Sequence, residues 1–200
     1  MFKAILIISI FLVTVQDSKK TILFFGDSLT AGNGISPANA FPALIQEKID
    51  SLGLSYSVIN AGLSGETSAG GLRRINWVLQ KPVDIFILEL GANDGLRGVK
   101  LNDTEKNLQQ IIDIVREKNP SVKIVLAGMK VPPNMGPVYE QQFDRLFPKL
   151  AKKNETALIP FLLKNVGGIK ELNQSDQIHP TEAGHQIVAK TVWETLYPLL

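Results

Sequence analysis

The sequence contains no cysteine and only two histidines in 200 residues. Without cysteine the chain has no disulfide framework, no thiolate nucleophile, no iron-sulfur or cysteine-ligated zinc site and no cysteine for lipidation. Two histidines and no His-Glu-x-x-His motif leave too few nitrogen ligands for a typical zinc hydrolase, although carboxylates alone could still bind a metal. We therefore expect a protein that uses neither a metal nor a cofactor.

The sequence also lacks an excess of charge of one sign. Its 21 Lys and Arg residues face 19 Asp and Glu residues, which gives a net charge of +2, and the basic residues are scattered along the chain. This balance gives no reason to expect nucleic acid or an anionic membrane as a partner. With 44% hydrophobic residues, the chain has the composition and length of one globular domain, and we expect a monomer.

The N-terminus carries the pattern of an export signal. Residues 1–3 form a short positive region, residues 4–15 an apolar run, and residues 16–20 a polar stretch. The apolar run is shorter than the roughly 20 residues that a membrane-spanning helix needs. We expect a signal peptide or N-terminal anchor over residues 1–20, export to the periplasm or beyond, and one mature domain over residues 21–200 that does not stay inserted in a membrane; a buried first strand is the alternative.

Beyond that segment, short apolar runs alternate with helical patterns, which predicts right-handed crossovers and a parallel sheet covered on both faces. Five runs have the composition of strands that are buried on both faces, namely residues 21–25, 56–59, 83–90, 123–129 and 157–159. Four stretches carry apolar residues at helical spacing, namely 41–52, 108–115 behind the N-cap candidates Asp103 and Thr104, 139–153 and 181–197. The expected fold is therefore α/β, with three layers and five parallel strands.

The first predicted strand runs into the sequence Gly26-Asp27-Ser28-Leu29. Ligands of a parallel sheet bind outside the carboxyl ends of its strands, so residues at these ends are candidates for function. Here a serine hydroxyl follows a glycine at the expected start of a helix. Because a helix N-terminus stabilises negative charge, the backbone N–H of Ser28 is a candidate donor to a developing oxyanion.

Two further strand ends carry possible hydrogen-bond donors. The second predicted strand leads to Asn60 and then to Ser64-Gly65-Glu66, where the glycine lets a backbone N–H approach a ligand closely. The third ends in Gly91-Ala92-Asn93-Asp94, and the Asn93 carboxamide is a second candidate oxyanion donor.

Near the C-terminus the segment Asp176-Gln177-Ile178-His179-Pro180 places a carboxylate three residues before an imidazole. In a turn, such a carboxylate can hold one ring nitrogen while the other faces a cleft. Taken singly, this spacing also fits a helix cap before Thr181, and Gly-Asp-Ser is common turn chemistry. Serine is a weak nucleophile that needs a base and oxyanion donors, and the sequence contains all of these groups.

Together and in this order, the four motifs resemble the four sequence blocks of the SGNH (GDSL) hydrolase family. The similarity covers nearly all of the mature chain and is closest to the bacterial secreted arylesterase and thioesterase/lysophospholipase branch. The resemblance implies a flavodoxin-like sheet in which Ser28 is the nucleophile, His179 the base and Asp176 the carboxylate that orients it. It also implies an oxyanion hole formed by the N–H groups of Ser28 and Gly65 and the side chain of Asn93.

These motifs predict a serine esterase that hydrolyses small carboxylic esters, and thioesters among them, through an acyl-enzyme. The loops beside the motifs are largely apolar, show no cluster of Lys or Arg and contain no long insertion for a lid, so we expect short to medium acyl chains. The predicted substrate-binding residues are Asp27, Leu29, Leu96, Val131, Pro132 and Ile178.

Three other functions compete with this interpretation. A carbohydrate O-deacetylase would use the same four blocks, and a secreted binding protein could keep the fold without the chemistry. A nucleotide-binding loop at residues 26–34 fits poorly, because that loop lacks the Gly-x-Gly-x-x-Gly pattern and a Lys-Ser/Thr pair. Two remaining titratable residues are interpreted as structural: Glu89, as a carboxylate that accepts hydrogen bonds near a strand end, and His185, at a surface or core position of the last helix.

Overall fold

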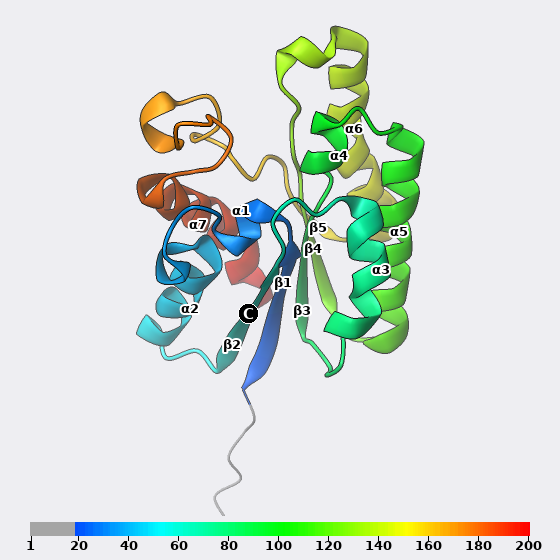
Figure 1. Ribbon diagram of the computed structural model, residues 1–200. Coiled ribbons are helices and arrows are strands. Elements are labelled where there is room, and N and C mark those ends of the chain that lie inside the picture. Colours follow the sequence, from blue (N-terminus) through cyan, green and yellow to red (C-terminus); the bar gives the residue numbers. More distant parts are fainter. Residues whose placement is uncertain (1–18) are drawn as a thin grey trace, which may run out of the picture.

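The computed structural model describes residues 19–200, apart from the side chain of Pro133. Residues 1–18, which hold most of the predicted signal or anchor segment, lie outside the described residues. Within residues 19–200 the chain forms one sheet of five parallel strands in the order β2-β1-β3-β4-β5 (Figure 1). The strands are β1 (Lys20–Gly26), β2 (Tyr56–Gly62), β3 (Ile85–Glu89), β4 (Lys123–Ala127) and β5 (Ala157–Ile159).

This strand order is flavodoxin-like, so the predicted fold class is confirmed. The chain moves from β1 to β2 on one side and then returns to β3 on the other side, and the direction of winding therefore reverses between β1 and β3. In open parallel sheets, ligands bind in the crevice that such a reversal creates beyond the carboxyl ends of the two strands. The segments that follow β1 and β3 are those that carry the predicted Ser28 and Asn93.

Helices cover both faces of the sheet, with α2 and α7 on one side and α3, α5 and α6 on the other (Figure 1). The α-helices are α1 (Ser28–Ala31), α2 (Phe41–Ser51), α3 (Ser68–Val78), α4 (Ala92–Leu96), α5 (Leu101–Lys118), α6 (Pro137–Asn154) and α7 (Glu182–Leu196). No helix within residues 19–200 combines the length and the apolar character needed to cross a membrane.

Helix α3 was not among the predicted helices, because its sequence has two glycines and few apolar residues on its buried face. Gly71 explains how it packs: a Cβ atom at this position would lie 2.4 Å from a methyl group of Leu90. Because Gly71 has no side chain, α3 can lie close to the sheet. This close backbone packing takes the place of the apolar side chains that usually mark the buried face of a helix in the sequence.

The predicted N-caps of α5 are wrong. The helix begins at Leu101 and its cap residue is Lys100, so Asp103 lies inside the first turn. Thr104 is fully buried, and its hydroxyl donates to the carboxylate of Asp94 at 3.2 Å instead of capping the helix. A buried hydroxyl needs a partner, and the neighbouring carboxylate provides it.

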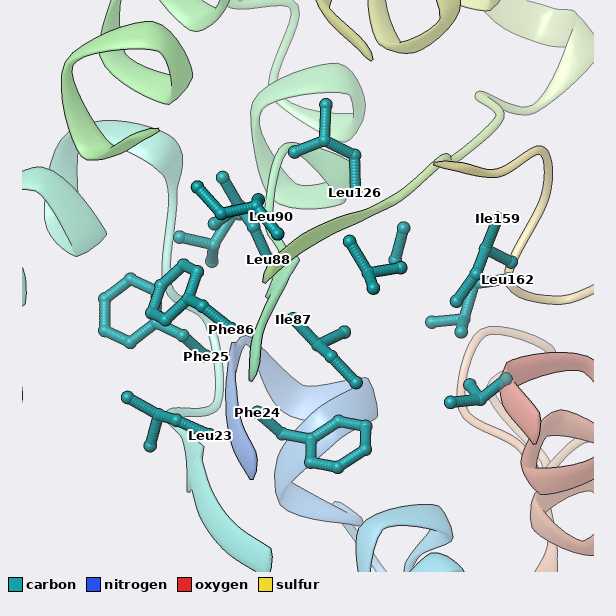
Figure 2. Close-up of a cluster of buried hydrophobic side chains, with 14 of the residues drawn as sticks. Leu23, Phe24, Phe25, Phe86, Ile87, Leu88, Leu90, Leu126, Ile159 and Leu162 are labelled. Atoms are coloured by element: carbon teal, nitrogen blue, oxygen red, sulfur yellow. The ribbon is translucent and has the colours of Figure 1, made fainter. Parts of the chain in front are cut away.

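The core covers both faces of the sheet, and the interior strands β1, β3 and β4 contribute to it. Phe24 and Phe25 are adjacent in β1, are fully buried and point to opposite faces of the sheet (Figure 2). Phe24 packs edge-on against Phe41 of α2, with ring centroids 5.5 Å apart, whereas Phe25 packs against Phe86 of β3 at 5.7 Å. Because both faces are buried, these strands are continuous apolar runs, as the sequence predicted.

Candidate active site

The nucleophile candidate Ser28 is the first residue of α1, directly after the turn that leaves β1. Gly26 permits this turn, because a Cβ atom there would lie 2.2 Å from the Thr30 hydroxyl and 2.4 Å from the Glu89 carboxyl. Asp27 caps the helix by accepting the N–H of Leu29 at 3.0 Å. Ser28 is 9% exposed, so its hydroxyl lies at the edge of the protein interior.

Three predicted residues meet at this position. His179 Nε2 lies 2.9 Å from the Ser28 Oγ, and His179 Nδ1 lies 2.6 Å from Asp176 Oδ2. The other oxygen of Asp176 accepts the N–H groups of Ile178 at 2.9 Å and His179 at 3.0 Å. These contacts put the imidazole between a hydroxyl and a carboxylate, although Ser28 and His179 are 151 residues apart in the sequence.

The carboxylate of Asp176 is held in its ionised form. Its hydrogen bond with the His179 side chain, reinforced by the two backbone N–H donors, lowers the pKa of Asp176 from 3.8 to about 2. An ionised carboxylate beside Nδ1 favours the tautomer that carries its proton on Nδ1. The lone pair on Nε2 then faces Ser28, which is the arrangement that a general base requires.

The loop that carries Asp176 and His179 is tied to the serine side of the site by Gln174. The Gln174 side-chain Nε2 donates to the carbonyl oxygens of Asn33 at 2.7 Å and Pro180 at 3.0 Å. Its backbone N–H donates to the His179 carbonyl oxygen at 2.7 Å. Asn33 follows α1, so one glutamine spans the two segments that hold the base and the nucleophile. Sequence reasoning missed Gln174, since no motif marks it.

Gly65 lies in a tight turn of the segment between β2 and α3. The Glu66 N–H donates to the Leu63 carbonyl oxygen at 3.1 Å, and Gly65 occupies the third position of this turn with φ +78°. A positive φ at that position is the type II pattern, which favours glycine. The Leu63 N–H donates to the Gly26 carbonyl oxygen at 2.9 Å, so the turn is attached to the residue that begins the Ser28 turn.

Asn93 connects the Ser28 turn with the Gly65 turn. Its side-chain Nδ2 donates to Asp27 Oδ2 at 3.0 Å and to the Glu66 carbonyl oxygen at 3.1 Å. A carboxamide nitrogen has two hydrogens, and here both have protein acceptors. Asn93 therefore joins the two turns that carry the other two predicted donors, and it would have to share or release one of these bonds to serve an oxyanion.

A pair of buried carboxyl groups lies beneath the serine turn. Glu89 Oε2 accepts the N–H of Asp27 at 3.0 Å and the hydroxyl of Thr30 at 2.8 Å. Burial, together with the nearby charge of Asp27, raises the pKa of Glu89 well above its usual range. Burial also raises the pKa of Asp27, from 3.8 to about 6, against the hydrogen bonds from Leu29 and Asn93 that lower it. Glu89 bonds the backbone of the turn, which fits its structural interpretation.

Asp94 is a further buried carboxylate that the motif analysis did not interpret. It accepts the backbone N–H of Ser68 at 2.8 Å, the Ser68 hydroxyl at 2.5 Å and the Thr104 hydroxyl at 3.2 Å. These bonds join α4 to the first residue of α3 and to α5. Because α3 follows directly on the Gly65 turn, Asp94 helps to fix that turn next to Asn93.

The predicted substrate-binding residues do not all lie on the surface. Leu29 and Val131 are 4% and 6% exposed and belong to the hydrophobic core, and Asp27 is buried as well. Leu29 faces inward because α1 packs against β1 and β2, and the Val131 side chain lies against Gly95 of α4. The other three predicted residues have exposed side chains, namely Leu96, Pro132 and Ile178.

Two further expectations concern charge and histidine. The expectation that no basic cluster adjoins the motifs is wrong, since Arg73, Arg74 and Arg97 line a recess next to Gly65.

His185 is 1% exposed, and its Nδ1 accepts the Phe41 N–H at 3.2 Å. Burial lowers the pKa of His185 from 6.5 to about 4, so this histidine is a neutral core residue. Within residues 19–200, no group of three or more His, Asp or Glu residues is placed to hold a metal ion.

A model of the GDSL-like lipase/acylhydrolase family matches residues 24–187. The chain belongs to this family. It is 39% identical over 195 residues to Esterase TesA of Pseudomonas aeruginosa, with 96% of both chains covered. It is 38% identical over 181 residues to Thioesterase 1/protease 1/lysophospholipase L1 of Escherichia coli K12, which covers 90% of this chain and 85% of that one.

Solved structures agree with this assignment. A crystal structure of TesA superposes with a TM-score of 0.86 at 39% identity, over 90% of this chain and all of that one. The esterase EstA from Pseudoalteromonas sp., inhibited by monoethylphosphonate, superposes with a TM-score of 0.84 at 30% identity, over 90% of this chain and 98% of that one. The resemblance and the fold that the sequence predicted are therefore confirmed.

Proposed function

We propose that this protein is a serine esterase that hydrolyses carboxylic esters and thioesters through an acyl-enzyme. The observation that carries the proposal is the chain of contacts from Asp176 through His179 to the Ser28 hydroxyl, at 2.6 Å and 2.9 Å. Family membership and the printed names of the relatives, an esterase and a thioesterase/lysophospholipase, support the same chemistry. The substrate is a small acyl ester, and no metal or cofactor takes part in the proposed steps.

In the first half of the reaction, His179 Nε2 takes the proton of Ser28 as the Ser28 Oγ forms a bond to the acyl carbon. Asp176 stabilises the imidazolium that results. The tetrahedral intermediate collapses when His179 returns the proton to the leaving alcohol or thiol, and Ser28 is left acylated. In the second half, water attacks the acyl carbon, His179 removes the water proton, and this proton passes to Ser28 when the acid leaves.

The negative charge of each tetrahedral intermediate develops on the former carbonyl oxygen. We assign its donors to the backbone N–H groups of Ser28 and Gly65 and to the side chain of Asn93. The first N–H belongs to the start of a helix and the second to a glycine turn, so both are fixed by backbone geometry before substrate arrives. Such preorganised donors stabilise an oxyanion more strongly than water molecules do, because they need no reorganisation during the reaction.

The substrate surface is assigned from the exposed apolar side chains around this centre. Leu63 and Ile178 are 50% and 46% exposed and come from the loops that carry Gly65 and His179, and Leu96 is 41% exposed at the end of α4, the short helix that carries Asn93. These loops are short, so we propose that acyl chains of short to medium length fit best. Pro132 extends the same apolar set from the loop after β4, and an acyl chain gains up to about 0.8 kcal/mol for each methylene that is buried.

The test begins with Ser28→Ala and a serine-directed phosphonate. Wild type should hydrolyse aryl esters and bind one phosphonate group covalently per molecule. The Ser28→Ala variant should show neither hydrolysis nor labelling, and its circular dichroism spectrum and thermal midpoint should equal those of wild type. Substantial hydrolysis by the purified Ser28→Ala variant would overturn the mechanism. Absence of any labelling or hydrolysis in wild type would favour a binding protein.

The acyl preference has its own test, a panel of aryl esters of increasing acyl length beside an acetylated xylan. We expect kcat/KM to rise by up to about fourfold with each methylene until the apolar surface is covered. A maximum at acetyl with a fall at once for longer chains, together with rapid turnover of the acetylated sugar, would indicate a carbohydrate deacetylase instead.

Export is the last part of the proposal and rests on the apolar run of residues 4–15 behind a positive N-terminus. The expected location is the periplasm or the medium, with the segment over residues 1–20 removed or retained as an anchor. N-terminal sequencing of protein recovered from the periplasmic fraction tests this. Intact Met1 on protein that stays in the cytoplasmic fraction would contradict it.

A further inference from the structure

A recess of about 490 Å³ adjoins the Gly65 turn. It is lined by the turn Leu63–Thr67, by Gly70 of α3, and by the side chains of three arginines. Arg73 and Arg74 belong to α3, whereas Arg97 is the C-cap residue directly after α4. The recess thus adjoins the proposed oxyanion donor and has positive charge on both of its sides.

Only one of the three arginines is neutralised inside the protein. Arg74 donates from both Nε and Nη2 to the Glu66 carboxylate and from Nη2 to the Ala61 carbonyl oxygen, and its guanidinium lies 4.4 Å from the centre of the Phe25 ring. Arg73 and Arg97 are exposed. Within residues 19–200, neither of them pairs with a carboxylate. With Glu66 offset by Arg74, the recess therefore carries a net charge of about +2 from these two side chains.

Arg97 also fixes this charge to the candidate active site. Its Nη2 donates to the Gly65 carbonyl oxygen at 3.1 Å, which uses one of the five N–H donors of a guanidinium and leaves the others available. The same turn is attached through Leu63 to Gly26, two residues before Ser28. A group bound by Arg97 would therefore lie against the turn that is attached, through Gly26, to the start of the Ser28 turn.

We infer that this recess binds a phosphate group carried by the leaving alcohol or thiol of the substrate. The inference rests on the proposed esterase function and names a specificity site for it. Guanidinium groups match phosphate oxygens with paired donors, so two unpaired arginines facing one open recess suit a phosphate. An uncharged acyl chain makes no favourable electrostatic contact with these arginines. The leaving group of a phosphorylated ester or thioester would bring its phosphate into contact with them.

The matched probes are S-butyryl-4′-phosphopantetheine and S-butyryl-pantetheine, which share the thioester, the acyl chain and the pantetheine arm and differ only in the terminal phosphate. The readout is the ratio of their kcat/KM values in wild type, Arg73→Gln, Arg97→Gln and the control Lys190→Gln. Lys190 is an exposed cation on α7, beside the groove between α2 and α7 and outside the recess. The ratio is formed from two kcat/KM values of the same variant. An effect of the Arg97 substitution on the Gly65 turn changes both values equally and therefore cancels.

We expect the ratio to fall by about three- to tenfold for each arginine variant and to keep its wild-type value in Lys190→Gln. The change should appear mainly in KM, since the phosphate is remote from the reacting bond, and it should shrink at 0.5 M salt. An unchanged ratio in both arginine variants would overturn the inference. So would an equal loss in the Lys190→Gln control, because that would show only a response to net charge.

A third probe separates the two sides of the substrate. The hemisuccinate ester of 4-nitrophenol carries its anion on the acyl part, and the neutral reference is the butyrate ester. A preference for hemisuccinate that Arg73→Gln removes would place the acyl part in the recess and overturn the assignment to the leaving group. If wild type hydrolyses neither the neutral thioester nor the butyrate ester of 4-nitrophenol, the proposed function itself fails. If it hydrolyses both and neither arginine variant changes the ratio, only the phosphate site is overturned.

Discussion

The Glu89 carboxyl accepts the backbone N–H of Asp27 at 3.0 Å, directly before the proposed nucleophile Ser28. The same oxygen accepts the hydroxyl of Thr30, and Glu89 is 1% exposed. A buried carboxyl at the end of β3 therefore satisfies two donors of the β1–α1 turn. Because burial raises the pKa of Glu89, the protonated form is favoured, and a neutral side chain of the same shape should be able to replace it.

Glu89→Gln should therefore preserve the turn, while Glu89→Leu should not. Glutamine keeps an acceptor oxygen, so we expect its free energy of unfolding to stay within about 1 kcal/mol of wild type and kcat to change little. Leucine leaves the Asp27 N–H and the Thr30 hydroxyl buried without an acceptor, which should cost about 2–4 kcal/mol. Urea unfolding and ester hydrolysis at neutral pH measure both effects. Equal stability of the two variants would show that Glu89 does not hold the turn.

The oxyanion role of Asn93 can be separated from its role as a connector. Asn93→Ala removes a side-chain donor, which at an oxyanion hole typically lowers kcat by about 10²–10³ and changes KM far less. The same change also removes the bonds to Asp27 and Glu66, so the thermal midpoint must be measured beside the kinetics. A raised KM with nearly normal kcat would show that Asn93 binds substrate or only joins the two turns.

Gln174 is predicted to be a positioning residue. Gln174→Ala removes the bonds to the carbonyl oxygens of Asn33 and Pro180. The loop with Asp176 and His179 should then hold the imidazole less tightly, so we expect kcat to fall by about tenfold with KM nearly unchanged. The matched control is Gln80→Ala: Gln80 lies just beyond the end of α3, and within residues 19–200 its exposed side chain bonds only the Asn76 carbonyl oxygen. A loss of the same size in the control, or a loss confined to KM, would contradict the prediction.

The sequence was sufficient for the strands and for the local motifs, because both depend on neighbours in the chain. Continuous apolar runs mark strands buried on two faces, and the spacing of Asp176 and His179 puts their hydrogen bond within one turn. The contact of His179 with Ser28 joins residues 151 positions apart, and only the family resemblance suggested it.

Other features depend on packing that no local pattern encodes. Leu29 and Val131 are as apolar as a substrate surface would be, yet the fold turns both into the core. The basic recess escaped notice because Arg97 lies far along the chain from the two arginines of α3 and meets them only in the folded protein. Helix α3 was hidden for a similar reason, since its contact with the sheet uses a glycine where a periodic apolar side chain was sought.

The buried His185 predicts a pH dependence of stability in the acid range. Burial lowers its pKa from 6.5 to about 4 in the folded protein, where it accepts the Phe41 N–H as a neutral ring. Between pH 6.5 and pH 4 the unfolded chain binds a proton at this position and the folded chain does not, so stability is lost as the pH falls. The contribution amounts to at most about 3 kcal/mol across this window.

The test compares urea unfolding of wild type and His185→Gln from pH 7 to pH 4. Glutamine can accept the Phe41 N–H but cannot titrate, so the stability of wild type relative to the variant should decline by about 2–3 kcal/mol as the pH falls. Asp27, whose pKa is raised to about 6, acts in the opposite direction, because its folded form gains protons first. That contribution is common to both proteins and cancels in the difference. A difference that stays constant with pH would show that His185 takes up a proton in the fold as readily as in the unfolded chain.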